Sequence, residues 1–174
     1  LLDAGDALLP VYVVEIRPNL RDRWRVFVDA ESGAVLRSYN ATCSDGPAKA
    51  AARDLGGQSR DIDTYLHQGS YYLIDASRPM FDAGASVFPD NPVGAILTLD
   101  AHETALDNVT HVSSANNSWN DASSVSAHAN AGVVYEYFRD VHQRDAIDGK
   151  GSTMISVVNV GENGAPMENA FWNG

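Results

Sequence analysis

Residues 121–144 carry the repeat of an α-helix, and no other feature of the sequence constrains the fold as strongly. Apolar side chains recur there at steps of four, three, four and three, which places them in one stripe along a helix. They are Ala127, Ala131, Val134, Phe138 and Val141. Asp121 or Ser123 could cap the N-terminus. An interior glycine costs about 1 kcal/mol relative to alanine, so we expect Gly132 to mark a close-packing site.

Most of the remaining chain alternates apolar and polar residues with a period near two, as β-strands require. Residues 10–39 contain three such runs, and turn formers that end in Gly33 fit a hairpin loop between the last two. A second hairpin is predicted over residues 58–75. Further strands are predicted at residues 95–101, 109–114 and 152–160, followed by a turn at 161–164 and an extended run. The predicted fold class is α+β, a mostly antiparallel β-sheet with one long helix (about 121–144), preceded by a small three-stranded β meander.

Residues 40–53 break this pattern. They are small, polar and rich in turn formers, which predicts a linker that a protease could reach. We therefore expect a small appendage on the N-terminal side of this stretch and a larger domain after it. A loop is predicted over residues 76–94, which contain three prolines.

Charge and composition exclude several classes of protein. The formal net charge is −11 and the 12 Lys and Arg residues are scattered, which argues against nucleic-acid binding. No apolar run approaches ~20 residues, so no membrane-spanning helix is predicted. The single cysteine, Cys43, permits no intrachain disulfide. The first residue is Leu1 and no leader pattern follows, so we expect a chain trimmed at both ends.

The titratable residues indicate no self-contained active site. Of the five histidines, none are spaced four apart as a two-histidine zinc site on a helix requires. His128 and His142 would lie ~21 Å apart along the helix, so we expect His128 to be a satisfied core histidine. The acidic pairs are expected in solvated turns and match no calcium loop: Asp61 with Asp63, Asp100 with Glu103, and Asp145 with Asp148. Taken alone, these residues indicate a soluble, acidic, strand-rich domain with a small appendage.

Three stretches together resemble the thermolysin-like secreted zinc metalloproteases. They are DLGGQSRDIDTYLHQGSYYLIDASRPMF at 54–81, SAHANAGVVYEYFRDVHQRDAIDG at 126–149, and NAFWNG at 169–174. Their order and spacing also match, so the resemblance covers about residues 54–174. The run WRVFVDAESGAVL at 24–36 is similar to the end of that family's propeptide. The resemblance implies that residues 1–44 are C-terminal propeptide strands and residues 45–174 the N-terminal β-rich subdomain of the peptidase.

The resemblance also implies a substrate-binding edge at the NAFW sequence. In the family, this strand borders the active-site cleft, and a peptide substrate adds to it as an antiparallel strand. By position, Asn169 would hydrogen-bond the substrate through its amide, Ala170 and Trp172 would offer backbone groups, and Phe171 would wall a pocket. The alternative is that the aromatics simply complete the core, and the two interpretations are compatible.

The family's H-E-x-x-H motif and its third zinc ligand are absent from these 174 residues. The resemblance therefore implies a fragment with no catalytic or metal-binding residue of its own. Zinc would be bound by the missing downstream half, and calcium could bind elsewhere in the parent protein. Ser126 also departs from the aspartate that relatives often carry. The implied partners are a peptide or protein substrate and the rest of the protease, and the implied location is extracellular. The alternative is a stand-alone binding, chaperone or inhibitory module.

Overall fold

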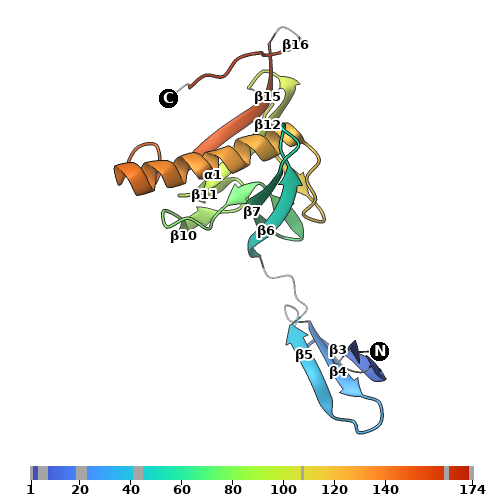
Figure 1. Ribbon diagram of the computed structural model, residues 1–174. Coiled ribbons are helices and arrows are strands. Elements are labelled where there is room, and N and C mark those ends of the chain that lie inside the picture. The colour runs from blue at the N-terminus through green and yellow to red at the C-terminus, as the bar shows by residue number, and fades with distance from the viewer. Residues whose placement is uncertain are drawn as a thin grey trace. The chain divides into compact units, whose positions relative to one another are not determined.

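In the computed structural model the chain divides into two compact units, Leu1–Ser44 and Asp45–Gly174 (Figure 1). The structure describes residues 2–3, 8–18, 23–40, 45–106, 108–162 and 165–172. The sequence predictions for Cys43 and for the middle of the 161–164 turn lie outside the described residues. No helix within the described ranges is long and apolar enough to cross a membrane.

The first unit contains the predicted three-stranded antiparallel meander. Its strands are β3 (Val11–Ile16), β4 (Trp24–Asp29) and β5 (Val35–Asn40), with β1 (Leu2–Asp3) and β2 (Leu8–Leu9) paired separately. The turn between β4 and β5 forms because the Asp29 carboxylate accepts the backbone N–H groups of Glu31 and Ser32 at 2.8 and 2.9 Å. Gly33 closes this turn at a φ of 73°, a conformation that glycine adopts without steric cost.

The described residues of the second unit form two main sheets, a hairpin and one helix. The four-stranded sheet has the order β14-β8-β7-β6. The five-stranded sheet has the order β13-β12-β15-β16, with β9 paired to β12. The strands are β6 (Gly46–Arg53), β7 (Ser59–His67), β8 (Ser70–Tyr72), β9 (Ile74–Asp75), β10 (Asp82–Val87), β11 (Asn91–Val93), β12 (Ile96–Thr104), β13 (Thr110–His111), β14 (Ser113–Ser114), β15 (Met154–Glu162) and β16 (Ala165–Pro166).

The fold class is α+β and mostly antiparallel, as predicted, but β12 and β15 pair in parallel. The helix α1 (Ala122–His142) lies between these two strands in sequence and contacts both of them, as well as β6 and β7. Parallel neighbours need a crossover connection of this kind because a tight turn cannot join them. The local alternation of a strand does not reveal this direction of pairing.

The prediction of the helix and its cap is confirmed. The Asp121 carboxylate accepts the backbone N–H groups of Ser123 and Ser124 at 3.1 and 3.2 Å, which satisfies two of the donors that a helix N-terminus leaves free. At the other end Gln143 adopts a left-handed conformation with a φ of 52°. Gly132 is buried against Arg78, and a Cβ atom there would lie 3.0 Å from the guanidinium.

The apolar stripe that the sequence suggested is not the buried face of α1. The side chains of Val134, Phe138 and Val141 are 45%, 38% and 60% exposed. The buried residues are Ser124, Val125, His128, Gly132 and Tyr135. Small and polar residues face the sheets because the helix approaches them closely and because His128 is hydrogen-bonded there. The pattern of apolar residues in the sequence does not reveal either cause.

The predicted linker is wrong over residues 46–53, which form the edge strand β6. Alternate alanines face inward, and Ala52 is 7% exposed in a cluster with Ile62 and Val125. Small side chains fit here because α1 contacts this strand. Alanine carries little hydrophobic contrast, so the alternation was invisible in the sequence. The predicted loop over 76–94 is also wrong in part, because it contains the β10–β11 hairpin.

Candidate functional site

The C-terminal segment leaves the five-stranded sheet at Met167. The strand β16 pairs with β15 through Gly161 opposite Pro166 and Glu162 opposite Ala165. The Met167 N–H then donates to the Val160 carbonyl at 2.8 Å. Beyond Met167, no regular strand runs through residues 168–172. The predicted extended run forms a paired strand only at Ala165–Pro166, and residues 168–172 pair with no neighbouring strand.

A hollow of about 310 Å³ lies between this segment and β15. One wall is formed by Ile155, Ser156, Val157 and Val160 of β15, and Leu106 and Met167 contribute further atoms. All four residues singled out in the sequence line it as well: Asn169, Ala170, Phe171 and Trp172. The structure thus brings together the predicted binding residues, whose role remains a prediction, on one side of one hollow.

The aromatic side chains of this segment are exposed. Phe171 and Trp172 are 57% and 68% exposed, so in this chain they do not complete the core. The Ala170 N–H donates to the side-chain oxygen of Asn169 at 2.9 Å. The β15 wall carries no motif that would mark it as part of a site, although the apolar period of residues 152–160 predicts a strand there. An exposed aromatic pair beside an unfilled hollow is typical of an interaction surface.

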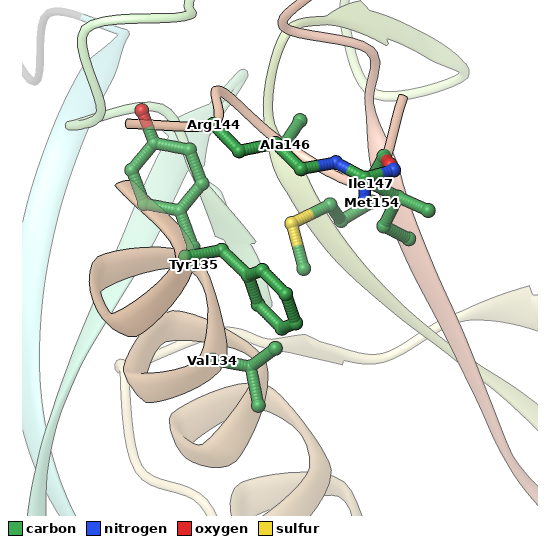
Figure 2. Close-up of a pocket in the computed structure, with 7 residues that line it drawn as sticks. Val134, Tyr135, Arg144, Ala146, Ile147 and Met154 are labelled. Carbon is green, nitrogen blue, oxygen red and sulfur yellow. The ribbon is translucent and has the colours of Figure 1, made fainter. Parts of the chain in front are cut away.

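A second hollow, of about 120 Å³, is almost wholly apolar and lies at the C-terminal end of α1. Figure 2 shows Met154 of β15 reaching toward the helix residue Val134, with Ala146 and Ile147 closing the far side. Tyr135 is 1% exposed, and its hydroxyl donates to Asp145 at 2.7 Å. This hollow contains no cluster of titratable groups suited to catalysis.

A network of ion pairs around Arg78 connects α1 with the neighbouring strands. The guanidinium donates to Asp75 at 2.6 Å, contacts Glu136, and lies 3.9 Å from Asp63. Burial opposes the charge of Arg78, but the three carboxylates outweigh it and raise the pKa of the guanidinium. Each charged group in this network has a partner of opposite charge, which is typical of an ion cluster that stabilises the fold.

His128 is a satisfied core histidine, as predicted. Its Nε2–H donates to the Asp63 carbonyl at 2.7 Å, because a carbonyl can only accept. In the neutral imidazole Nδ1 then accepts from the Thr98 hydroxyl at 3.0 Å. His128 is 3% exposed, and burial lowers the pKa of its imidazole. Both ring nitrogens are held by hydrogen bonds, and His128 also lines a hollow of about 270 Å³ that includes Arg78 and Glu136.

The acidic pairs are not all in solvated turns. Asp61 and Asp63 lie in β7, and Asp100 and Glu103 lie in β12. Asp148 does lie in a turn, where the Ser152 hydroxyl and the Lys150 N–H lower its pKa to about 2. Over the described ranges, no three His, Cys, Asp or Glu residues gather in a group that could hold a metal ion. These residues therefore do not fit a zinc site.

Comparison with known proteins gives the family. The sequence pattern of the thermolysin metallopeptidase catalytic domain matches residues 49–174. Bacillolysin of Brevibacillus brevis is 32% identical over 167 residues, which cover 94% of this chain and 28% of that protein. Neutral protease B of Bacillus subtilis (strain 168) is 30% identical over 153 residues, or 87% of this chain and 26% of that protein.

A third relative is the thermolysin of Bacillus sp. (strain EA1), which is 31% identical over 184 aligned positions covering 98% of this chain and 31% of that protein. The chain thus spans less than a third of the length of these relatives. The match over residues 49–174 nevertheless covers well over half of the chain. The chain therefore belongs to the thermolysin metallopeptidase family.

Proposed function

We propose that this chain is the N-terminal part of a secreted zinc metalloendopeptidase and that Asn169–Trp172 form an edge on which an extended peptide substrate adds. The observation that carries the proposal is the hollow of about 310 Å³ that these four residues share with β15. Exposed aromatics beside free backbone groups suit strand addition, in which main-chain hydrogen bonds supply affinity and side chains select the substrate.

Each residue has a distinct part in this proposal. Ala170 and Trp172 offer backbone groups to the peptide, and Phe171 walls the pocket for one of its side chains. The Asn169 amide hydrogen-bonds the peptide backbone. Because the Oδ1 atom of Asn169 accepts the Ala170 N–H at 2.9 Å, a peptide carbonyl that accepts from the Ala170 N–H must replace that local bond, whereas the Nδ2–H groups of Asn169 can donate to the peptide without breaking it. Exchanging one hydrogen bond for another contributes only about 1 kcal/mol, so the aromatic contacts must supply much of the affinity.

The chemistry of cleavage does not reside in these 174 residues. The H-E-x-x-H motif is absent from these residues, so we propose that zinc and its ligands belong to the rest of the protease. We propose that the chain alone is inactive and that calcium binds elsewhere in the parent protein. We further propose that residues 1–44 are propeptide strands. The stand-alone binding or inhibitory module is the alternative, and no feature of the described residues favours it.

A peptide titration of the 174-residue chain, followed by backbone chemical shifts, tests the binding edge. We expect shifts at Asn169–Trp172 and a loss of about fivefold to tenfold in affinity for Phe171→Ala. The control is Tyr137→Ala, which truncates a 53% exposed aromatic on α1. Equal affinity for wild type and Phe171→Ala would contradict the binding edge.

The proposed inactivity of the isolated chain needs a separate assay. Cleavage of a fluorogenic peptide is measured with and without added zinc. We expect the background rate in both cases, and zinc-dependent turnover would contradict the proposal.

A further inference from the structure

A carboxylate, an imidazole and a hydroxyl meet where β12 pairs with β13. Asp100 of β12 lies directly opposite Thr110 of β13 in the antiparallel register. Residues opposed in such a pair project from the same face of the sheet, and a residue two positions along the strand does so as well. His102 is two positions beyond Asp100. The pairing of the two strands therefore brings these three side chains to one place.

The two ring nitrogens of His102 connect the carboxylate with the hydroxyl. Nδ1 lies 3.4 Å from Oδ2 of Asp100, and Nε2 lies 2.6 Å from the Thr110 hydroxyl oxygen. An ionised carboxylate can only accept a hydrogen bond, so in the neutral ring the proton belongs on Nδ1. Nε2 then carries the lone pair, and the Thr110 hydroxyl donates to it. The imidazole is thus oriented as a base toward the oxygen of Thr110.

The Asp100 carboxylate is itself held in place. Its Oδ1 accepts the backbone N–H of His102 at 2.8 Å and the side-chain amide of Asn159 at 3.0 Å, and Oδ2 faces the imidazole. A nucleophile, a base and a third group that orients the base are the parts that activate a hydroxyl for acyl transfer. The 3.4 Å contact is long for a hydrogen bond, but such contacts are often long in an unliganded site and tighten in the transition state.

The backbone around these side chains is distorted. His102 and Glu103 both adopt left-handed conformations, with φ of 52° and 56°, and Asn159 of the neighbouring strand β15 does so with a φ of 51°. The pairing of β12 with β15 shifts its register between Asp100 and Thr104. Residues other than glycine rarely adopt such conformations, and those that do cluster at functional sites. The distortion is a second observation, independent of the side-chain contacts, that points to a function here.

Exposure to solvent distinguishes His102 from the other histidine that contacts a hydroxyl. His128 is 3% exposed, and its second partner is a backbone carbonyl rather than a carboxylate. The side chain of His102 is 49% exposed, that of Asp100 is 20% exposed, and Thr110 is exposed. A small molecule can therefore reach the Thr110 oxygen, while the orienting carboxylate is partly shielded from water.

We propose that Thr110 is a nucleophilic hydroxyl that accepts an acyl group from a small activated ester, with His102 as its base and Asp100 as the residue that orients this base. The Thr110 Oγ1 forms a bond to the ester carbonyl carbon while its proton passes to Nε2 of His102. The bond from that carbon to the leaving oxygen then breaks, the alcohol departs as its anion, and the imidazolium returns the proton to water. This activity goes beyond the proposed substrate edge and does not rest on it, because none of the three residues belongs to Asn169–Trp172.

Acetylation of the 174-residue chain by p-nitrophenyl acetate tests the proposal. A Cys43→Ser background prevents the thiol from consuming the ester. Peptide mass spectrometry over a time course locates the acetyl groups and measures the rate at each residue. We expect acetylation at Thr110 that is about a hundredfold slower in His102→Gln, the lower end of what general-base catalysis contributes. Thr110→Ser should remain reactive at position 110, and Thr110→Val should not be acetylated there.

The matched control within the same chain is Ser152. Its hydroxyl donates to the Asp148 carboxylate at 2.6 Å, so it has a carboxylate as its partner in place of an imidazole. We expect acetylation at Ser152 to be far slower than at Thr110 in the folded chain, and the two rates to become similar in denaturing urea. Equal rates in the folded chain, a Thr110 rate that persists in urea, or an unchanged rate in His102→Gln would each overturn the proposal. Acetyl groups found on lysine or histidine side chains alone would overturn it as well.

Discussion

Replacing Arg78 with methionine should destabilise the second unit more than any other single charge removal in it. The Asp75 side chain that Arg78 binds is 4% exposed, and the Arg78 side chain is 20% exposed. Removing one partner of a buried ion pair typically costs 3–5 kcal/mol, because the remaining charge stays desolvated. Ser77 still donates its N–H and hydroxyl to Asp75 at 2.8 and 2.6 Å, so we place the loss near the lower end, at about 3 kcal/mol.

Urea denaturation followed by tryptophan fluorescence measures this loss. With a dependence of about 2 kcal/mol per molar urea, the midpoint for Arg78→Met should fall by about 1.5 M. The matched control is Arg139→Met, because Arg139 is an exposed partner of Glu136 in the same network. Its effect should be much smaller, as for other surface ion pairs.

A double variant separates the ion pair from the packing of the arginine stem. Asp75→Asn combined with Arg78→Met removes the buried charge and should recover a substantial part of the stability lost in Arg78→Met alone. A midpoint for Arg78→Met that equals the Arg139→Met control would refute the reasoning, since Asp75 would then not depend on its arginine.

Three further perturbations test the fold around the site. Burial lowers the pKa of His128 in the folded chain, so the unfolded chain takes up the proton first as the pH falls. The free energy of unfolding should therefore be constant above about pH 6.5 and fall by up to about 1.4 kcal/mol per pH unit below it. Urea midpoints measured across this range should show a smaller slope for His128→Gln. Asp121→Ala removes the helix cap and should lower the free energy of unfolding by about 1 kcal/mol, and an unchanged midpoint would mean that water replaces the cap. Gly161→Ala should lower the free energy of unfolding by more than about 2 kcal/mol, because its Cβ would lie 2.0 Å from the Glu103 carbonyl oxygen. The control Gly84→Ala meets only a side-chain oxygen at 3.4 Å, so thermal melting should show it to be nearly neutral.

The outward face of α1 shows the limit of periodicity arguments. The helix and its cap follow from local chemistry, since an aspartate before a helical repeat satisfies the first free N–H groups wherever the helix lies. Which face is buried depends on what packs against it. Here Arg78 occupies the space that Gly132 leaves open, and His128 finds its partners on β7 and β12.

The strand β6 shows the same limit for composition. Its alanines carry too little hydrophobic contrast to reveal alternation, and only the approach of α1 makes small side chains the suitable ones. The parallel pairing of β12 with β15 was equally hidden, because the direction of a neighbouring strand leaves no trace in the residues of either one.

The sequence by itself determined the local elements, namely the helix, the meander and the hairpin turns, because capping groups and side-chain periods act within a few residues. It also indicated the family, through three stretches whose order and spacing match it, the last of which contains the NAFW segment. Only the tertiary structure decided which strands lie side by side, which helix face is covered, and that Asn169–Trp172 share a hollow with β15. These contacts join residues far apart in the chain, so their energies depend on shape and distance that no local pattern contains.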